Sequence, residues 1–260
     1  MRRRLGVLGW AAMAVGAVLA PLGPTGAQSR EGLRVEHPAG RARLTLVRLD
    51  PARYAPRLLT RSDGPPRALP DWARAHGLVA AINAAMYEAD GRATSLLVRA
   101  GVEESPDDAR FGGLFAFDPR GAGAAPVILA GRDCEGTDLD ALRRGYASLV
   151  ASYRLLGCDG APIEWQDHDR YTAAAVGVDR DGHVVLALSR AQLRMSELAH
   201  ELAAPRLRIA SIMFVEGGPE ATLWADSGRR ELLVTGRYAS GEDPERPWPL
   251  PNVLGFVRVP

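Results

Sequence analysis

Short apolar runs separated by glycine and proline dominate the chain. Residues 42–50 (ARLTLVRLD) alternate apolar and polar positions, which is typical of a half-buried strand. The hairpin signal is clearest at 173–189, where two apolar arms flank the turn-forming segment Asp179-Arg-Asp-Gly182. Four further apolar runs also predict strands: 77–83, 94–101, 112–121 and 125–131.

Helical spacing is less frequent. Three short segments place their apolar residues on one face: 68–77, 137–150 and 195–204. We expect Thr137 or Asp138 to cap the second helix and Ser196 to cap the third. A buried strand, 209–215, follows the third helix. These elements predict an α+β fold, a single domain with a central mixed, largely antiparallel β-sheet flanked by a few helices.

The first residues have a different pattern. A basic start (MRRR), an apolar stretch over 5–20 and a small-residue exit predict a signal peptide over 1–27, followed by one domain over 28–260. The apolar stretch is shorter than the roughly 20 residues of a spanning helix. We therefore expect an exported protein, periplasmic or extracellular, with no membrane span after cleavage. An uncleaved anchor and a twin-arginine export route both stay open.

Composition narrows the possible functions. Hydrophobic residues make up 47% of the 260 residues, and 32 basic and 31 acidic residues give a net charge of +1, so nothing favours nucleic acid as a partner. The chain contains no lysine, which excludes Schiff-base chemistry and which we interpret as the coding bias of a GC-rich bacterium. The five histidines lack metal-ligand spacing, and we predict neither a metal nor a cofactor. The oligomeric state stays open.

The two cysteines are Cys134 and Cys158. In an oxidising compartment they could form a disulfide that closes a loop of about 24 residues and contributes roughly 3 kcal/mol. Two buried thiols are the alternative.

The segment FVEGGPEATLW, residues 214–224, is the main candidate for chemistry. A buried strand ends there at Glu216, two glycines and a proline, and a second carboxylate, Glu220, follows. The glycines would let backbone N–H groups approach an anion, and the carboxyl groups could transfer protons. A carboxylate that only caps the next turn is the alternative.

In its order of motifs the chain resembles the phosphodiester glycosidase family, whose vertebrate member removes N-acetylglucosamine from a phosphodiester. The family's strand ends in Asp-Gly-Gly where this chain has Glu216-Gly217-Gly218. The resemblance spans about 78–260 and rests on three more segments and the closing strand: 80–101, 155–162, 169–182 and 252–260.

The resemblance implies an enzyme that hydrolyses sugar-phosphodiester or related glycosidic linkages, with a carbohydrate or sugar phosphate as its partner. Carried onto this sequence, it implies Glu216 and Asp159 as catalytic residues in one cleft with Glu216 at its floor. The substrate-binding residues that it implies are Asn83, Arg170, Gly217, Gly218 and Thr222.

Several positions depart from the family pattern. Ala173 stands where the family usually has an arginine that suits a phosphate, and Ala85 and Ser95 replace glycines. Glu220 and Ala221 occupy positions where serines are usual. These departures leave a second hypothesis open: a catalytically weak or inactive member that binds carbohydrate or the cell envelope.

Overall fold

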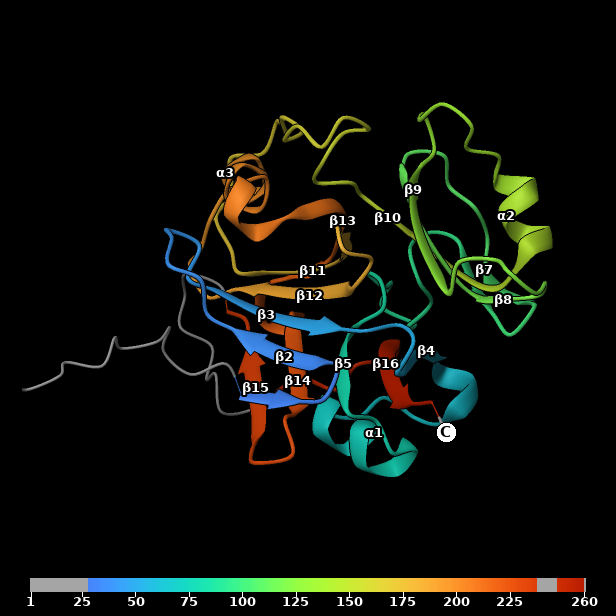
Figure 1. The fold of residues 1–260 in the computed structure, drawn as a ribbon, viewed down its shortest axis with the longest axis horizontal. Helices are drawn as coiled ribbons and strands as arrows, with labels where there is room; N and C mark the ends of the chain where they lie inside the picture. The colour runs from blue at the N-terminus through green and yellow to red at the C-terminus, as the bar shows by residue number, and fades with distance from the viewer. Residues whose placement is uncertain (1–27, 238–246, 260) are drawn as a thin grey trace, which may run out of the picture.

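The computed structural model describes residues 28–237 and 247–259, and in them the strands form three antiparallel sheets (Figure 1). The single domain and the largely antiparallel pairing agree with the prediction, but three sheets are more than the one central sheet expected. The predicted mixed character is wrong, because every neighbouring pair among the described strands is antiparallel. The predicted signal peptide lies outside the described residues. In the described part of the chain, no helix is both long and apolar enough to cross a membrane.

The first sheet has six strands and contains the predicted hairpin. In spatial order its strands are β1 (Gln28–Arg30), β2 (Leu33–Glu36), β3 (Leu44–Leu49), β12 (Val184–Ser189), β11 (Ala173–Asp179) and β13 (Ile209–Gly217). The prediction of a half-buried β3 is wrong, because all six of its residues are buried. Val47 and Leu49 pack into one hydrophobic cluster, whereas Leu44 and Leu46 pack into another, so both faces of this strand are covered.

The second sheet has five strands, two of which follow the predicted runs at 112–121 and 125–131. Its order is β7 (Val102–Ser105), β6 (Leu97–Arg99), β10 (Tyr146–Ser152), β8 (Gly113–Pro119) and β9 (Val127–Gly131). The helix predicted over 137–150 is much shorter: α2 covers Leu139–Gly145, with Asp138 as its cap. The rest is β10, because pairing with β6 and β8 on its two sides outweighs the helical spacing.

The third sheet also has five strands, in the order β15 (Glu231–Thr235), β14 (Thr222–Asp226), β5 (Ala80–Asn83), β16 (Val253–Arg258) and β4 (Tyr54–Leu59). The predicted first helix is α1 (Leu69–His76), which ends at Gly77 in the left-handed conformation (φ 64°). It buries Trp72 against this sheet, and the indole N–H donates to the carbonyl of Leu250 at 2.9 Å.

The third helix, α3 (Met195–Leu202), covers the outer face of the first sheet (Figure 1). Ser196 is not its cap, because the helix already begins at Met195 and Arg194 is the capping residue. Carboxylates satisfy the first amides instead: Glu197 accepts from the Arg194 N–H, and Asp167 accepts from the Met195 N–H. Single turns of 3₁₀ helix lie at Arg61–Asp63, Pro205–Leu207 and Gly218–Glu220.

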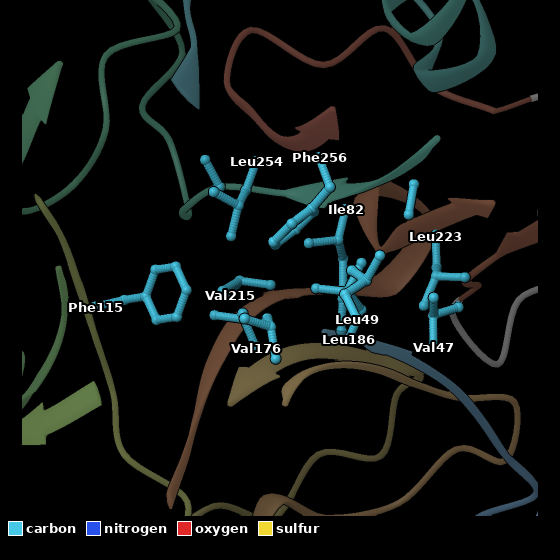
Figure 2. Packing of buried hydrophobic residues seen from close by; sticks show 14 of the residues in the cluster. Val47, Leu49, Ile82, Phe115, Val176, Leu186, Val215, Leu223, Leu254 and Phe256 are labelled. Atoms are coloured by element: carbon cyan, nitrogen blue, oxygen red, sulfur yellow. The ribbon is translucent and has the colours of Figure 1, made fainter. Parts of the chain in front are cut away.

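The main hydrophobic core lies between the first and third sheets (Figure 2). Val176, Leu186 and Val215 of the first sheet face Ile82 and Leu254 of the third, and Phe115 of the second sheet closes one side of the cluster. A 3₁₀ turn, Gly218–Glu220, carries the chain from β13 in the first sheet to β14 in the third. The candidate segment therefore lies where two sheets are joined.

Candidate active site at the end of β13

Glu216 is the last side chain of β13, and an irregularity in strand pairing helps to place it. Ala175 of β11 lies opposite Phe214, whereas the preceding Ala174 lies opposite Glu216. Val215 is therefore an inserted residue, a β-bulge of the kind that redirects side chains beside functional sites. Val215 packs into the main core, and Phe214 and Glu216 both face a cavity on the opposite side.

This cavity has a volume of about 240 Å³ and mainly aromatic walls. Trp165 contacts Tyr153 edge-on, with their ring centroids 5.1 Å apart. Trp165 and Tyr171 each lie edge-on to Phe214, with centroids 6.4 Å apart in both pairs. The residues that line the cavity are Met86, Tyr153, Trp165, Tyr171, Phe214, Glu216 and Gly217.

Backbone pairing fixes one wall to β13. The Phe214 N–H donates to the Tyr153 carbonyl at 2.8 Å, and the Leu155 N–H donates to the Ile212 carbonyl at 3.0 Å. The segment after β10 thus extends the first sheet beside β13 and presents Tyr153 to the cavity. At Gly217 a Cβ atom would lie 2.7 Å from the Tyr171 ring, so only glycine permits this approach of ring and backbone.

The Glu216 carboxyl group has an unusual environment. Burial raises its pKa from 4.5 to about 8, the negative charge of Glu220 adds to this rise, and a hydrogen bond from the Gly217 N–H to Oε1, at 3.0 Å, opposes it. At neutral pH this group is therefore mainly protonated. An apolar pocket has the same effect on a general acid in other enzymes.

Asn83 holds the turn behind the cavity. Its side-chain amide donates to the Glu220 carbonyl, its Oδ1 accepts from the Thr222 N–H, and both hydrogen bonds measure 2.8 Å. The residue is 1% exposed, and it does not line the cavity. Its place in the structure is that of a residue that fixes the Gly218–Glu220 turn.

The glycine amides are engaged within the fold. The Gly217 N–H donates to Glu216, and the Gly218 N–H donates to the Thr172 carbonyl at 2.9 Å. Gly218 has a φ of +67°, which favours glycine. Thr222 is fully buried and its hydroxyl donates to the Glu220 carbonyl at 3.2 Å. These groups shape the turn.

The two remaining predicted residues lie on the surface. Asp159 is exposed, and its carboxylate accepts from the Ala161 N–H at 2.9 Å, as a turn residue does. Arg170 is exposed and forms an ion pair with Glu197 at 2.8 Å. Of the predicted set, the structure brings Glu216 and Gly217 to the cavity, whereas Asp159 and Arg170 do not line it.

The aromatic walls are the part of the site that sequence reasoning missed. Aromatic residues make up only 6% of the chain, yet four of them meet at this one cavity. They come from the segment just after β10, a loop, the segment just before β11, and β13, so no short motif contains them. The signal that could have indicated them is Trp165 and Tyr171 on either side of the polar segment 166–170.

Cys134 and Cys158 form a disulfide, with an S–S distance of 2.04 Å. The bond joins the loop after β9 to the loop between Tyr153 and Trp165. The Arg154 guanidinium lies against both sulfur atoms, at 3.1 and 3.3 Å, and also pairs with Asp133.

Two clusters of potential metal ligands occur in the described residues, both apart from the cavity. In the first, Asp133 neighbours the two bonded cysteines and pairs with Arg154. The second consists of Asp179, Asp181 and His183, and arginines already neutralise its carboxylates: Arg48 pairs with Asp179 at 2.7 Å, and Arg208 pairs with Asp181 at 2.6 Å. Neither cluster forms part of the candidate site.

The profile of the phosphodiester glycosidase family matches residues 76–257. The chain belongs to this family. None of the curated protein sequences matches this chain significantly. The family domain therefore includes β5, which carries Asn83, as well as β13 and all the residues that line the cavity.

Solved structures show the same fold at low sequence identity. The catalytic domain of zebrafish N-acetylglucosamine-1-phosphodiester alpha-N-acetylglucosaminidase, auto-inhibited by its pro-peptide, superposes with a TM-score of 0.60 at 12% identity, over 86% of this chain and 77% of that one. A Synechocystis protein gives 0.61 at 14% identity, over 87% of this chain and 62% of that one. A Burkholderia pseudomallei protein described as exported gives 0.52 at 12% identity, over 82% and 73%.

The departures from the family pattern lie close to the cavity or in the core. Ala173, at the position where an arginine is usual, is 1% exposed and lies opposite Gly217 in the strand pairing. It packs in the same hydrophobic cluster as Phe214 and the partly buried wall residues. Ala85 and Ala221 are buried as well, and Ser95 is 1% exposed. At position 173 this member of the family has a small apolar side chain beside its cavity.

Proposed function

We propose that the protein is an exported hydrolase of sugar-phosphodiester or related glycosidic linkages, in which Glu216 is the general acid. One observation carries this proposal: a partly buried carboxyl group, whose pKa desolvation raises to about 8, lies in an aromatic cavity. A group that keeps its proton at neutral pH can donate it to the oxygen of a leaving group. Aromatic walls suit the apolar faces of a sugar ring.

A second carboxyl group lies close to the first. Glycosidases typically use two, one of which donates a proton while the other acts as base or nucleophile. Glu220, in the turn after Glu216, is close enough for its charge to raise the pKa of Glu216. In this proposal Glu220 replaces Asp159 as the second candidate carboxylate, because Asp159 lies on the surface.

A non-catalytic carbohydrate-binding protein is the second candidate. Among the described residues that line the cavity, Glu216 is the only one with a carboxyl group, which favours this second candidate. The same aromatic walls would hold a sugar without cleaving it. The two candidates differ in one measurable property, turnover.

Two observations support export. The disulfide between Cys134 and Cys158 is of a kind that persists in oxidising compartments. The similar Burkholderia structure is described as an exported protein. Together with the sequence of residues 1–27, they favour the periplasm or the extracellular space.

The test compares the purified protein with a Glu216→Gln variant on sugar 1-phosphodiesters and simple O-glycosides, with product sugar as the readout. Loss of a positioned general acid should reduce kcat by about 10²–10⁴-fold. Glu103→Gln is the control, because Glu103 lies in β7 and forms an ion pair with Arg143 that is half exposed. Equal rates for Glu216→Gln and the unmodified protein would remove Glu216 from the mechanism. Binding without turnover would favour the second candidate.

A further inference from the structure

In the part of the chain that the structure describes, the cavity at Glu216 presents no cation to an anion. Among the described residues that line it, none is cationic, and five are the apolar or aromatic side chains of Met86, Tyr153, Trp165, Tyr171 and Phe214. A phosphate in such walls would lose its hydration without gaining a cation, which is costly. It would also lie beside Glu216 and within the field of Glu220.

The arginines next to wall residues are already paired with carboxylates. Arg154 follows Tyr153 and pairs with Asp133, and Arg170 precedes Tyr171 and pairs with Glu197. Arg110 lies beside Phe111, whose ring packs on Tyr153, and its guanidinium pairs with Asp108 at 2.6 Å. To bind a phosphate in the cavity, any of the three would have to leave its partner.

Backbone amides offer no substitute. Oriented N–H groups can bind a phosphate without any arginine, as they do in phosphate-binding loops. In the Glu216-Gly217-Gly218 segment, however, both glycine amides already donate within the protein, one to the Glu216 carboxyl group and one to the Thr172 carbonyl. The segment thus lacks both means of holding an anion.

Leaving-group chemistry points in the same direction. A phosphate departs readily as an anion, so a proton donor contributes little to breaking its bond to a sugar. An alcohol or sugar hydroxyl departs as a far more basic alkoxide and gains most from a proton donated as the bond breaks. A protonated carboxyl group in a cavity without cations matches the second case.

On the basis of the proposed function, we infer that the substrate is an uncharged O-glycoside with an alcohol or sugar as its leaving group, and that it is not a sugar phosphodiester. The Glu216 carboxyl proton passes to the glycosidic oxygen as that oxygen's bond to the anomeric carbon breaks. Water adds its oxygen to the anomeric carbon, and the proton that it loses restores the glutamate. The net reaction consumes one glycoside and one water and releases a sugar and an alcohol.

The cavity size limits what lies inside it. At about 240 Å³ it is smaller than the 300–1,000 Å³ typical of pockets for drug-sized ligands, so it accommodates about one ring. The ring would contact Trp165, Tyr171 and Phe214, and the atoms bound to the glycosidic oxygen would lie beside Glu216. Only the rest of the leaving group would extend outward. The enzyme would therefore remove a single terminal sugar.

The test uses matched pairs of substrates that share a sugar and differ in the leaving group. Each pair consists of a methyl hexoside, or methyl N-acetylhexosaminide, and the 1-(methyl phosphate) of the same sugar, in both anomers. Turnover is measured with the unmodified protein. Affinity is measured by calorimetry with Glu216→Gln, whose uncharged side chain resembles the protonated acid and should not turn the ligand over.

We expect the uncharged member of the preferred pair to bind at least about 10-fold more tightly and to be hydrolysed at least about 100-fold more efficiently. Faster hydrolysis of the phosphodiester would overturn this inference and leave the proposed hydrolase standing. Tighter binding of uncharged glycosides with no turnover of any substrate would overturn the hydrolase and uphold the ligand class. Binding and turnover of neither class would overturn both.

Discussion

Two carboxyl groups, Asp179 buried and Glu216 partly buried, lie at opposite ends of the same pair of strands, β11 and β13, and their surroundings differ. Asp179 ends β11 opposite Ile209, where β13 begins, and Glu216 lies near the end of β13, opposite Ala174. The side chain of Asp179 is 2% exposed and lies 2.7 Å from the Arg48 guanidinium. The cavity of Glu216 has no cation among the described residues that line it.

At the Asp179 end of the strands, the negative charge of the carboxylate is fully compensated. Arg48, itself buried, also bonds to Glu36 and donates to the Leu207 carbonyl at 2.6 Å. The second oxygen of Asp179 accepts the amide hydrogens of Asp181 and His183 and so closes the hairpin turn. This carboxylate serves the fold.

At the other end, one backbone amide is the only hydrogen-bond partner that the described contacts give to the Glu216 carboxyl group. A protein that needed only stability would have placed a cation or an apolar residue there. A poorly compensated carboxyl group in an aromatic cavity is instead typical of a functional site. The comparison teaches that compensation of the charge, more than burial, separates a structural carboxyl group from a candidate for chemistry.

Removal of the Arg48 cation should destabilise the protein, because Asp179 depends on it. Arg48→Met leaves Asp179 buried without its countercharge, and we expect a loss of about 3–5 kcal/mol in the free energy of unfolding, measured in urea. Arg74→Met is the control, because the Arg74 pair with Asp71 is 61% exposed on both sides and should change stability by less than about 1 kcal/mol. Equal effects of the two variants would contradict the assignment of Asp179 to the fold.

At the Glu216 end, removal of the ionisable group should stabilise the protein at high pH. Between about pH 4.5 and 8 the folded protein retains a proton on Glu216 that the unfolded chain releases, so this group lowers the free energy of unfolding as pH rises through that window. Glu216→Gln abolishes this decline. At about 1.36 kcal/mol per pKa unit, the variant should exceed the unmodified protein by a few kcal/mol at pH 8 and match it near pH 4.

Melting temperatures of both proteins from pH 4 to 9 check this expectation. Glu220, whose charge acts on Glu216, and the phenol groups of Tyr153 and Tyr171 in the walls are common to both proteins. The difference between the two curves therefore reports Glu216. Parallel curves would show that its pKa is not raised.

The turn that joins the two sheets gives a third test. Asn83→Ala leaves the Glu220 carbonyl and the Thr222 N–H without the side chain that now binds both, at a cost of about 1–3 kcal/mol. Because the turn carries Glu220, we also expect a shift in the pH at which activity is lost. Asn252→Ala is a matched control: Asn252 is 4% exposed and bonds to the Gly91 carbonyl at 3.2 Å. It should lower stability without moving the pH profile, and identical profiles for both variants would contradict a positioning role for Asn83.

How much the sequence predicted depends on whether the signal is local. The hairpin over 173–189 was predicted correctly because its turn residues and both arms are contiguous. Residues 146–150 were predicted wrongly as helix, because they form a strand only through pairing with β6 and β8, which are distant in sequence. The same reason explains the three sheets, since the spacing of apolar residues does not show which strands pair.

For the candidate site, too, the sequence indicated the residues in continuous motifs and not those brought together from separate segments. Glu216 was predicted because it lies in a continuous motif, and the structure places it in a cavity. Asn83 was predicted from its motif as a substrate-binding residue, but the structure places it behind the cavity, where it contacts Glu220 and Thr222, more than 130 residues away in sequence. Trp165 and Tyr153 could not be assigned to a wall, because their partners come from separate segments.

Trp165 offers the smallest and most selective test of the comparison. Its indole N–H is buried, and no hydrogen-bond partner occurs for it in the part of the chain that the structure describes. Trp165→Phe removes this unsatisfied donor and part of an aromatic ring, two effects that oppose each other, so stability should change by only about 1 kcal/mol. Sugar affinity, measured by calorimetry in the Glu216→Gln background, should fall by about 10-fold because the lost ring area belongs to the cavity wall. A large loss of stability with unchanged affinity would instead make Trp165 a core residue, like those around Asp179.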